Sequence, residues 1–201
     1  MCAAKAEVAT TEPRRTARDR IFDSAKDLFY RYGIRAVGVE SIAAEADATK
    51  MTLYRNFSSK DELVAECLRD HKREFWDWWE TVIAPHEGDP KAQLLALMNA
   101  FICHECGDRS RGCPLANAVV ELPEKSHPGR AVIVEHKFLI RERLRELCRD
   151  MEAKDPDTLG DALHLLIEGA YISQLTFDCK DDPADALPRI AETLIEAHLK
   201  K

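Results

Sequence analysis

The feature that most constrains the fold of this chain is a long stripe of apolar side chains at helical spacing, which begins near residue 60. Ser59 and Glu62 stand three residues apart, as in a capping box, where two side chains satisfy the free amides at a helix start. The stripe that follows consists of Leu63, Cys67, His71, Phe75, Trp78, Trp79 and Val82. Side chains that recur every three to four residues share one helical face, so this spacing predicts a helix of about six turns. Pro85 and Gly88 end it.

Shorter helical segments precede this long helix. The first is expected from about Arg15 to Tyr32, because its apolar residues lie on one face and Gly33 is a stop signal. A second helix is expected over 39–46 and a third over 50–56.

The three residues 47–49, between the second and third helices, form a turn. Asp47 tolerates left-handed backbone better than most residues other than glycine. Thr49 can accept a hydrogen bond from the free amides of the helix that it precedes. Two short helices joined by such a turn make a helix-turn-helix.

Proline and glycine divide the rest of the chain into further helices. Asp155-Pro156 and Asp182-Pro183 are typical helix starts, because proline fits a first turn and an acidic side chain favours the positive end of a helix. The expected helices are 90–105, 114–122, 130–151, 157–177 and 184–199. Since the sequence contains no convincing strand and no internal repeat, the expected fold class is all-α, with a three-helix N-terminal head and a helical C-terminal body.

The composition is that of an ordinary globular protein. The chain has 201 residues, of which 45% are apolar and 32% charged. A chain of this size and apolar content can bury a hydrophobic core without disulfides or metal ions to stabilise it. No stretch approaches the roughly 18 consecutive apolar residues of a membrane span, and the N-terminus is too polar for a secretory signal. A cytoplasmic location is therefore expected. The seven cysteines are irregularly spaced, which predicts reduced thiols instead of a disulfide framework.

The net charge of −7 hides an asymmetry between the two parts of the chain. Residues 1–60 hold eleven Lys and Arg against eight Asp and Glu, whereas residues 61–201 hold eighteen against twenty-eight. A basic head on an acidic body is how a DNA-binding protein can have an acidic composition, although chance clustering of surface charge is the alternative. Arg14, Arg15 and Arg18 are expected to form a flexible basic arm that adds DNA contacts, with disorder as the alternative.

The last two expected helices each have an apolar face wide enough to pack on the body and also to contact a second subunit. The residues on these faces are Leu163, Leu166, Ile167, Ala170, Ile172, Leu187, Ile190, Ala191, Leu194 and Ile195. We interpret them as a dimerising four-helix bundle, with two helices from each chain. The alternative is that both faces belong to the core of the monomer.

A run of motif residues extends through the head and into the long helix. It consists of Arg20-Ile21, Ala25, Leu28-Phe29, Gly33, Val39, Ile42-Ala43, Ala46, Thr52-Leu53-Tyr54-Arg55-Asn56-Phe57 and Ser59-Lys60-Asp61-Glu62-Leu63. Over residues 15–65 this pattern resembles the tetracycline-repressor (TetR) family of bacterial transcription regulators. The resemblance implies a DNA-binding repressor, not an enzyme: a homodimer whose heads bind a palindromic operator and whose bodies bind a small-molecule effector that weakens DNA binding. It divides the chain into an arm (1–14), a helix-turn-helix domain (15–60) and an effector-binding and dimerisation domain (61–201).

Two positions depart from the family pattern, which usually has glycine at the first and often at the second. Asp47 can still make the turn, although it adds a negative charge near DNA. Met51 stands inside the recognition helix, where a small residue would let the backbone approach the duplex. It could touch a thymine methyl or turn inward onto the core of the head, and we expect it in the core.

The third helix and its flanks hold the candidates for DNA contacts. Phosphates are met by cations and hydroxyls near helix N-termini, and base edges by side chains that extend from the recognition helix. The expected phosphate contacts are Thr49, Tyr54 and Lys60, of which the resemblance supports Tyr54 and Lys60. The expected base contacts are Lys50, Thr52, Arg55 and Asn56. Arg55 or Asn56 could bind the DNA backbone instead, and Lys60 could be a solvated lysine.

Cysteine and histidine residues in the body suggest other chemistry. Cys103-His104-Glu105-Cys106 resembles half a zinc site, but no fourth ligand is defined, so no metal and no cofactor are expected. Cys113 precedes a helix start and stands near Arg109 and Arg111, surroundings that favour a thiolate. A thiol-based redox or electrophile sensor is therefore the alternative function, and a buried inert cysteine is the simpler interpretation.

A cysteine-dependent enzyme is a less favoured reading of the same residues. Cys113 would be its nucleophile and His127 or His136 its base. The sequence supplies neither a third orienting residue nor an oxyanion site for such chemistry.

An effector pocket is expected between the long helices, where aromatic and polar groups converge. The candidates for its walls are Phe101, His104, Cys113, Asn117, Glu121, His136, Glu168 and Tyr171. Each of these side chains could instead be a satisfied core or surface group.

Overall fold

The computed structural model describes residues 15–102, 111–177 and 181–199, and most of these are helical. The helices are α1 (Ala17–Tyr32), α2 (Val39–Glu45), α3 (Lys50–Asn56), α4 (Lys60–Ile83), α5 (Pro90–Ile102), α6 (Pro114–Glu121), α7 (Pro128–Asp150), α8 (Pro156–Phe177) and α9 (Leu187–His198). Two short 3-10 helices, Ala84–His86 and Pro183–Ala186, precede α5 and α9. Strands are absent from the described ranges, and the predicted all-α class is confirmed.

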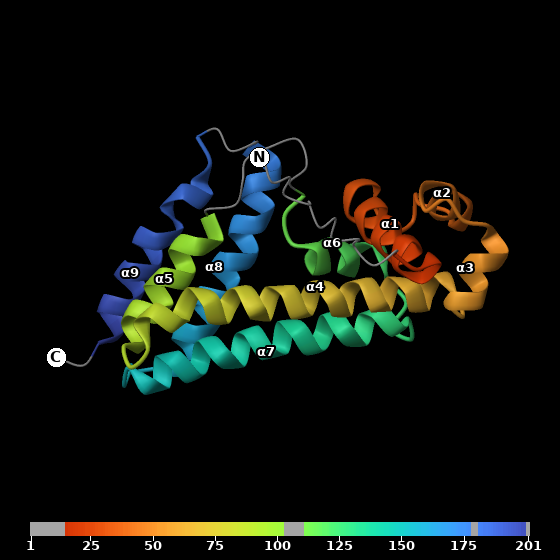
Figure 1. The fold of residues 1–201 in the computed structure, drawn as a ribbon. Helices are drawn as coiled ribbons and strands as arrows, with labels where there is room; N and C mark the ends of the chain where they lie inside the picture. The colour runs from red at the N-terminus through yellow and green to blue at the C-terminus, as the bar shows by residue number, and fades with distance from the viewer. Residues whose placement is uncertain (1–14, 103–110, 178–180, 200–201) are drawn as a thin grey trace, which may run out of the picture.

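Helix α4 joins the two parts of the molecule (Figure 1). The short helices α1, α2 and α3 gather at its N-terminal end, α5, α8 and α9 lie toward its other end, and α7 runs alongside it. The start of α4 is fixed by the Ser59 hydroxyl, which accepts a hydrogen bond from the Glu62 amide at 3.0 Å. Its 24 residues continue without a break from the head into the body.

The core of the head is built from one or two side chains of each short helix. Ile21 and Ala25 of α1, Ile42 of α2 and Leu53 of α3 have no exposed surface. Phe57, just after α3, covers the same cluster. The apolar face predicted for the first helix is therefore confirmed at Ile21 and Ala25, and burial of such faces is what stabilises helices this short.

The start of α1 corrects the expectation of a basic arm. Thr16 and Asp19 form a reciprocal capping box, so the helix begins one residue before Arg18. Arg18 is consequently part of α1, where its guanidinium pairs with an acidic side chain of α4. Arg15 is ion-paired as well, and Arg14 lies outside the described residues.

The turn between α2 and α3 has the predicted geometry. Asp47 adopts a φ of 47°, in the left-handed region. Arg20 of α1 donates to the carbonyl of Ala46 at 3.0 Å and to that of Asp47 at 3.3 Å. Thr49 caps α3, as predicted, by accepting a hydrogen bond from the Thr52 amide at 3.1 Å. These bonds fix the direction of α3 relative to α1.

Helices α7 and α8 pack very closely in the body. A Cβ atom on Gly160 would lie 2.9 Å from the Arg145 Cα, a separation that only glycine allows. Arg141 and Arg145 of α7 both donate to the Asp161 carboxylate of α8, at 2.7–2.8 Å. These bonds hold the pKa of Asp161 well below its ordinary value. The contact between the two helices is thus both tight and charge-paired.

The apolar faces of α8 and α9 are used mostly inside the chain. Six of the ten residues that we assign to a dimer interface are instead buried in the core: Leu163, Ile167, Ala170, Leu187, Ala191 and Ile195. The reason is that these faces turn toward α5, α7 and each other. The outward faces still expose Leu165, at 72%, together with Ile172 and Ile190.

Candidate nucleic-acid interface and ligand cavity

One face of α3 points away from the head. Lys50, Tyr54 and Arg55 are exposed on α3, while Leu53 faces the core. The expectation that Met51 turns inward is wrong, because this side chain is 74% exposed. Met51 precedes Leu53 by two residues and so lies about 200° away around the helix. The two side chains cannot both face inward.

Several polar side chains of α3 bond to neighbours within the head. The hydroxyls of Thr49 and Thr52 lie 2.9 Å apart. The Lys50 ammonium pairs with Glu40 of α2 at 2.5 Å, which raises the pKa of Lys50. The Asn56 amide donates to the Thr52 carbonyl at 2.8 Å. These bonds hold the candidate DNA contacts in defined positions before any partner arrives.

Lys60, the first residue of α4, is turned toward the end of α1. Its ammonium donates to the Ile34 carbonyl at 2.6 Å and lies 5.8 Å from the centre of the Phe29 ring. Partial burial lowers the pKa of Lys60, because a buried ammonium loses solvation. A contact with DNA phosphate would require this ammonium to be shared with, or to leave, the carbonyl.

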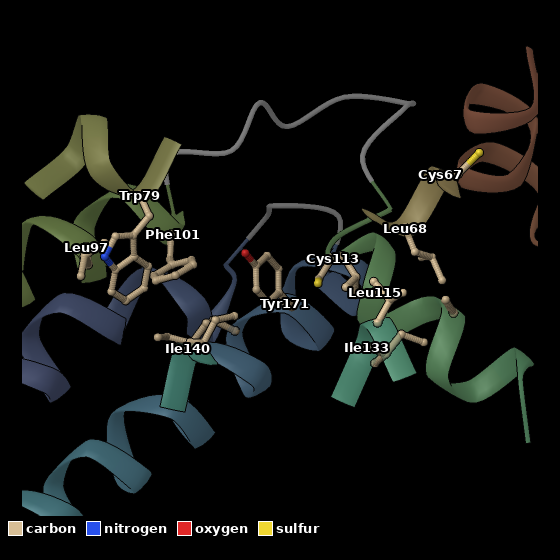
Figure 2. Close-up of a cluster of buried hydrophobic side chains, with 14 of the residues drawn as sticks. Cys67, Leu68, Trp79, Leu97, Phe101, Cys113, Leu115, Ile133, Ile140 and Tyr171 are labelled. Carbon is tan, nitrogen blue, oxygen red and sulfur yellow. The ribbon is translucent and has the colours of Figure 1, made fainter. Parts of the chain in front are cut away.

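A cavity of about 340 Å³ lies where the head meets the body. Its aromatic walls come from Tyr30 of α1, Phe75 and Trp78 of α4, and Tyr171 of α8. Cys113, at the start of α6, also lines it, and Figure 2 shows Cys113 and Tyr171 in one buried cluster. Its volume is within the usual range for small-molecule sites.

The sequence-predicted effector residues divide into groups in space. Those that line the cavity are Cys113, His136 and Tyr171. Those that line a smaller cavity of about 20 Å³ are Asn117 and Glu121. Phe101 packs behind the aromatic wall, with its ring centre 5.0 Å from that of Trp78, and Glu168 pairs with Lys137. His104 lies outside the described residues.

Sequence reasoning misses the walls that α1 and α4 supply. Tyr30, Phe75 and Trp78 stand on apolar helical stripes, where aromatic residues are normally core. One residue could have indicated these walls from the sequence. His71 is an ionisable side chain on the otherwise apolar face of α4, and it lines the cavity.

The charged groups around the cavity are neutralised by neighbours. Glu74, a charged residue of the lining, pairs with Lys26 of α1. Behind the wall, Lys137 of α7 pairs with Glu168 of α8. Within the described part of the chain, the cavity therefore presents no unpaired charge to a ligand.

His136 of α7 is a buried polar group in the cavity wall. It has no exposed surface, and neither ring nitrogen has a hydrogen-bond partner among the described residues. Its ring packs edge-on against Phe75, with 4.7 Å between ring centres. Burial, together with nearby Lys137 and Lys72, lowers the pKa of His136 to about 3. The imidazole is therefore neutral near pH 7 and offers one donor and one acceptor.

Tyr30 connects the cavity to the head. Its hydroxyl donates to the Gly112 carbonyl at 3.2 Å and accepts a hydrogen bond from the Arg111 amide at 2.8 Å. Nearby, the Glu121 carboxylate of α6 accepts a hydrogen bond from the Arg35 amide at 2.9 Å. The head is thus bonded to the segment that forms one wall of the cavity.

The surroundings of Cys113 differ from those expected. The Arg111 guanidinium is turned away to the Tyr30 carbonyl, to which it donates at 3.0 Å, and Arg109 lies outside the described residues. The cation next to Cys113 is instead Lys137 of α7, with its Nζ atom 3.7 Å from the sulfur. Cys113 is buried at the N-cap position of α6.

The described residues contain no group of three or more His, Cys, Asp or Glu side chains placed to hold a metal ion. The zinc candidates Cys103, His104, Glu105 and Cys106 lie outside these ranges. No described helix is both long and apolar enough to cross a membrane.

Three short helices around one core, with a polar face on the third, define a helix-turn-helix DNA-binding protein. Residues 21–67 match the family described as bacterial regulatory proteins, tetR family. The chain is a TetR-family transcriptional regulator, which confirms the resemblance seen in its motifs.

Known proteins resemble this chain over most of its length. HTH-type transcriptional regulator LmrA from Bacillus subtilis (strain 168) is 28% identical in an alignment 171 residues long that covers 80% of this chain and 87% of that protein. HTH-type transcriptional regulator YjdC from Escherichia coli (strain K12) is 23% identical and covers 89% of this chain and 93% of its own length. The crystal structure of SCO4454, a TetR-family transcriptional regulator from Streptomyces coelicolor, matches with a TM-score of 0.82 at 27% identity, over 92% of this chain and 96% of that one. The likeness therefore includes the helical body.

Proposed function

We propose that the protein is a repressor that binds a palindromic operator as a homodimer and is released when a small molecule occupies the cavity. The observation that carries this proposal is the position of Tyr30, which belongs to the head and also lines the cavity. A ligand there touches an element of the DNA-binding head directly. An effector acts only through different affinities for two states, and this contact can supply the difference. Because such a regulator works where the DNA is, the proposal includes a cytoplasmic location.

The exposed side of α3 supports roles for individual side chains on DNA. We assign the base edges to Lys50, Thr52, Arg55 and Asn56. The exposure of Met51 supports a contact between its side chain and a thymine methyl. Phosphates are assigned to Thr49, Tyr54 and Lys60.

Selection of bound fragments from random duplex DNA, followed by sequencing, tests operator binding and gives the operator. Lys60→Ala is then expected to weaken binding to operator and to random DNA alike, with a salt slope shallower by about one. Lys50→Ala is expected to change which operator positions matter. Lys154→Ala, which removes an exposed cation from the body, is the matched control and should change neither property. A changed sequence preference in Lys60→Ala would reverse the two roles.

The outward faces of α8 and α9 support the homodimer. Leu165 and Ile172 of α8, with Ile190 of α9, leave apolar surface exposed on adjacent helices. Two copies of this helix pair would bury that surface in a four-helix bundle. Light scattering at micromolar concentration is expected to show a dimer. A monomer would contradict the proposal that the protein binds its operator as a homodimer.

A thiol-based sensor is the second candidate, favoured by the contact between Lys137 and the Cys113 sulfur. Burial raises the pKa of Cys67 and of Cys148 to about 12, so these two thiols should react slowly. Brief treatment with iodoacetamide, in which a thiolate displaces iodide, is expected to label Cys113 faster than Cys67 or Cys148, as measured by mass spectrometry. Two results would contradict the thiol sensor: slow labelling of Cys113, or a Cys113→Ser variant that an oxidant still releases from operator DNA. Either result would leave a non-covalent effector as the signal.

A further inference from the structure

We infer that the cavity takes an uncharged, flat aromatic ligand with one hydroxyl group, a phenol of about two fused rings, and that the hydroxyl bonds to His136. This inference rests on the proposed function only in calling the ligand an effector. It names the ligand class from the walls, the charges and the unpaired imidazole of this one cavity.

The walls favour a flat ligand. Tyr30, Phe75, Trp78 and Tyr171 present four aromatic rings to the cavity. Phe101 supports two of them from behind, with ring centres 5.0 Å from Trp78 and 5.9 Å from Tyr171. Aromatic side chains pack favourably against other aromatic rings in stacked and edge-on arrangements. A volume of about 340 Å³ is sufficient for a bicyclic molecule.

The charges favour an uncharged ligand. The Glu74 carboxylate in the wall is already paired with Lys26, and Lys137 behind the wall is paired with Glu168. A ligand ion would lose its hydration without gaining a free counter-charge among the described residues, and this desolvation is costly. Carboxylates and ammonium compounds are therefore disfavoured.

His136 supplies the polar requirement. Its two ring nitrogens are fully buried and unpaired among the described residues, which is unfavourable unless a partner arrives. Because neither nitrogen has accessible surface in the cavity, a ligand reaches one only when the imidazole or the Phe75 ring packed against it turns. A ligand hydroxyl both donates and accepts, so it can then bond to either tautomer of a neutral imidazole. A hydrocarbon of the same shape would fill the cavity but leave the imidazole unpaired.

Isothermal titration calorimetry without DNA tests this inference with three probes that share one ring system. They are 2-naphthol, 2-methylnaphthalene, in which a methyl replaces the hydroxyl, and 2-naphthoate, which is charged. In the wild type, 2-naphthol should bind at least as tightly as the more apolar 2-methylnaphthalene, and at least about a hundredfold more tightly than 2-naphthoate. If the wild type bound 2-methylnaphthalene more tightly than 2-naphthol, or bound 2-naphthoate tightly, the inference would be overturned by these wild-type measurements alone.

The variant His136→Phe keeps a ring at this position and removes the polar atoms. It should shift the ratio of the two dissociation constants about tenfold toward 2-methylnaphthalene, because one hydrogen bond to a buried group is lost. His164→Phe, which changes a histidine outside the cavity lining, is the matched control and should leave the ratio unchanged. An unchanged ratio in His136→Phe would contradict the assigned partner.

Operator binding, measured separately, distinguishes this inference from the proposed function. If 2-naphthol binds as expected but leaves operator affinity unchanged, the effector role fails and the ligand class stands. If 2-naphthol does not bind while another compound releases the DNA, the ligand class fails and the repressor stands.

Discussion

The head and the body of this regulator differ in one respect: among the described residues, only the body buries polar side-chain atoms that have no hydrogen-bond partner. In the head, polar groups lie at the surface and bond to each other, as Lys50 does with Glu40, over a fully buried core. In the body, the buried His136 has no partner among the described residues and borders a cavity. Empty volume and unpaired buried polar groups both destabilise a fold. The head is thus a completed unit that presents a fixed surface, whereas the interior of the body would be completed by the proposed effector.

The largest expected effect tests whether the head can fail while the body survives. Phe57→Ala removes a buried ring from the core of the head and should cost about 3–5 kcal/mol of its stability. DNA binding and hydrogen-exchange protection of α1–α3 should be lost, while the proposed dimer and the protection of α7 and α8 should remain. Hydrogen exchange with mass spectrometry and light scattering measure both.

Val120→Ala is the control for this change, because Val120 is 81% exposed and its truncation should stay within about 0.5 kcal/mol. Loss of protection throughout the chain in Phe57→Ala would show that head and body unfold as one unit, and the contrast between them would not hold.

The second prediction concerns the unpaired imidazole of the body. The pKa of His136 is about 3 in the folded chain against an ordinary 6.5, so between these pH values the unfolded chain binds a proton that the folded chain does not. Stability is therefore full above pH 6.5 and decreases as the pH falls toward 3. From pH 7 to pH 5, the wild type should lose about 2 kcal/mol more than His136→Phe. Urea unfolding at fixed protein concentration measures the free energy of unfolding at each pH. Equal losses in the wild type and in His136→Phe would refute the prediction.

The third prediction tests the link between the two regions. Tyr30→Phe removes the hydroxyl that bonds to Gly112 and Arg111 but keeps the ring in the cavity wall. The effect of saturating 2-naphthol on operator affinity should fall by about 1 kcal/mol, roughly fivefold, because one hydrogen bond of the coupling is lost. Tyr32→Phe, on an exposed tyrosine of the same helix, is the control. Equal responses in both variants would place the coupling elsewhere.

The smallest expected effect belongs to the surface of the head. Glu40→Gln frees Lys50 from an exposed ion pair, which contributes little to stability. The free energy of unfolding should change by less than about 0.5 kcal/mol, while DNA affinity should rise a few-fold at low salt and lose this gain at high salt. Binding titrations at two salt concentrations measure it, and a large loss of stability would mean that the head depends on its surface pairs.

The features of the head that were predictable from sequence are local. The turn at Asp47 and the cap at Thr49 each follow from residues a few positions apart. Met51 shows the cost of reasoning from residue type, since its tendency to fill gaps suggests the core while its angle from Leu53 places it outside.

The features of the body were less predictable because they depend on residues far apart in the chain. The isolation of His136 arises where α7 meets Phe75 of α4, and the walls of the cavity need Tyr30 from the head. Periodicity identified the apolar faces of α8 and α9 but could not tell which part of each face the chain buries itself. Cys113 was a candidate from sequence, yet its neighbouring cation, Lys137, comes from another helix.

The unbroken length of α4 has a geometric consequence for DNA. Its 24 residues span about 36 Å, from the head, past the cavity walls at the middle of the helix, to its far end in the body. A tilt of about 5° about its far end moves the other end by about 3 Å over that length. In the proposed dimer the two heads would shift by up to about 6 Å relative to each other, which exceeds the base-pair step of about 3.4 Å. A displacement smaller than a side chain near the far end of α4 would then move the two heads of the proposed dimer by more than one base pair. Their recognition helices would no longer be in register with both half-sites of the operator.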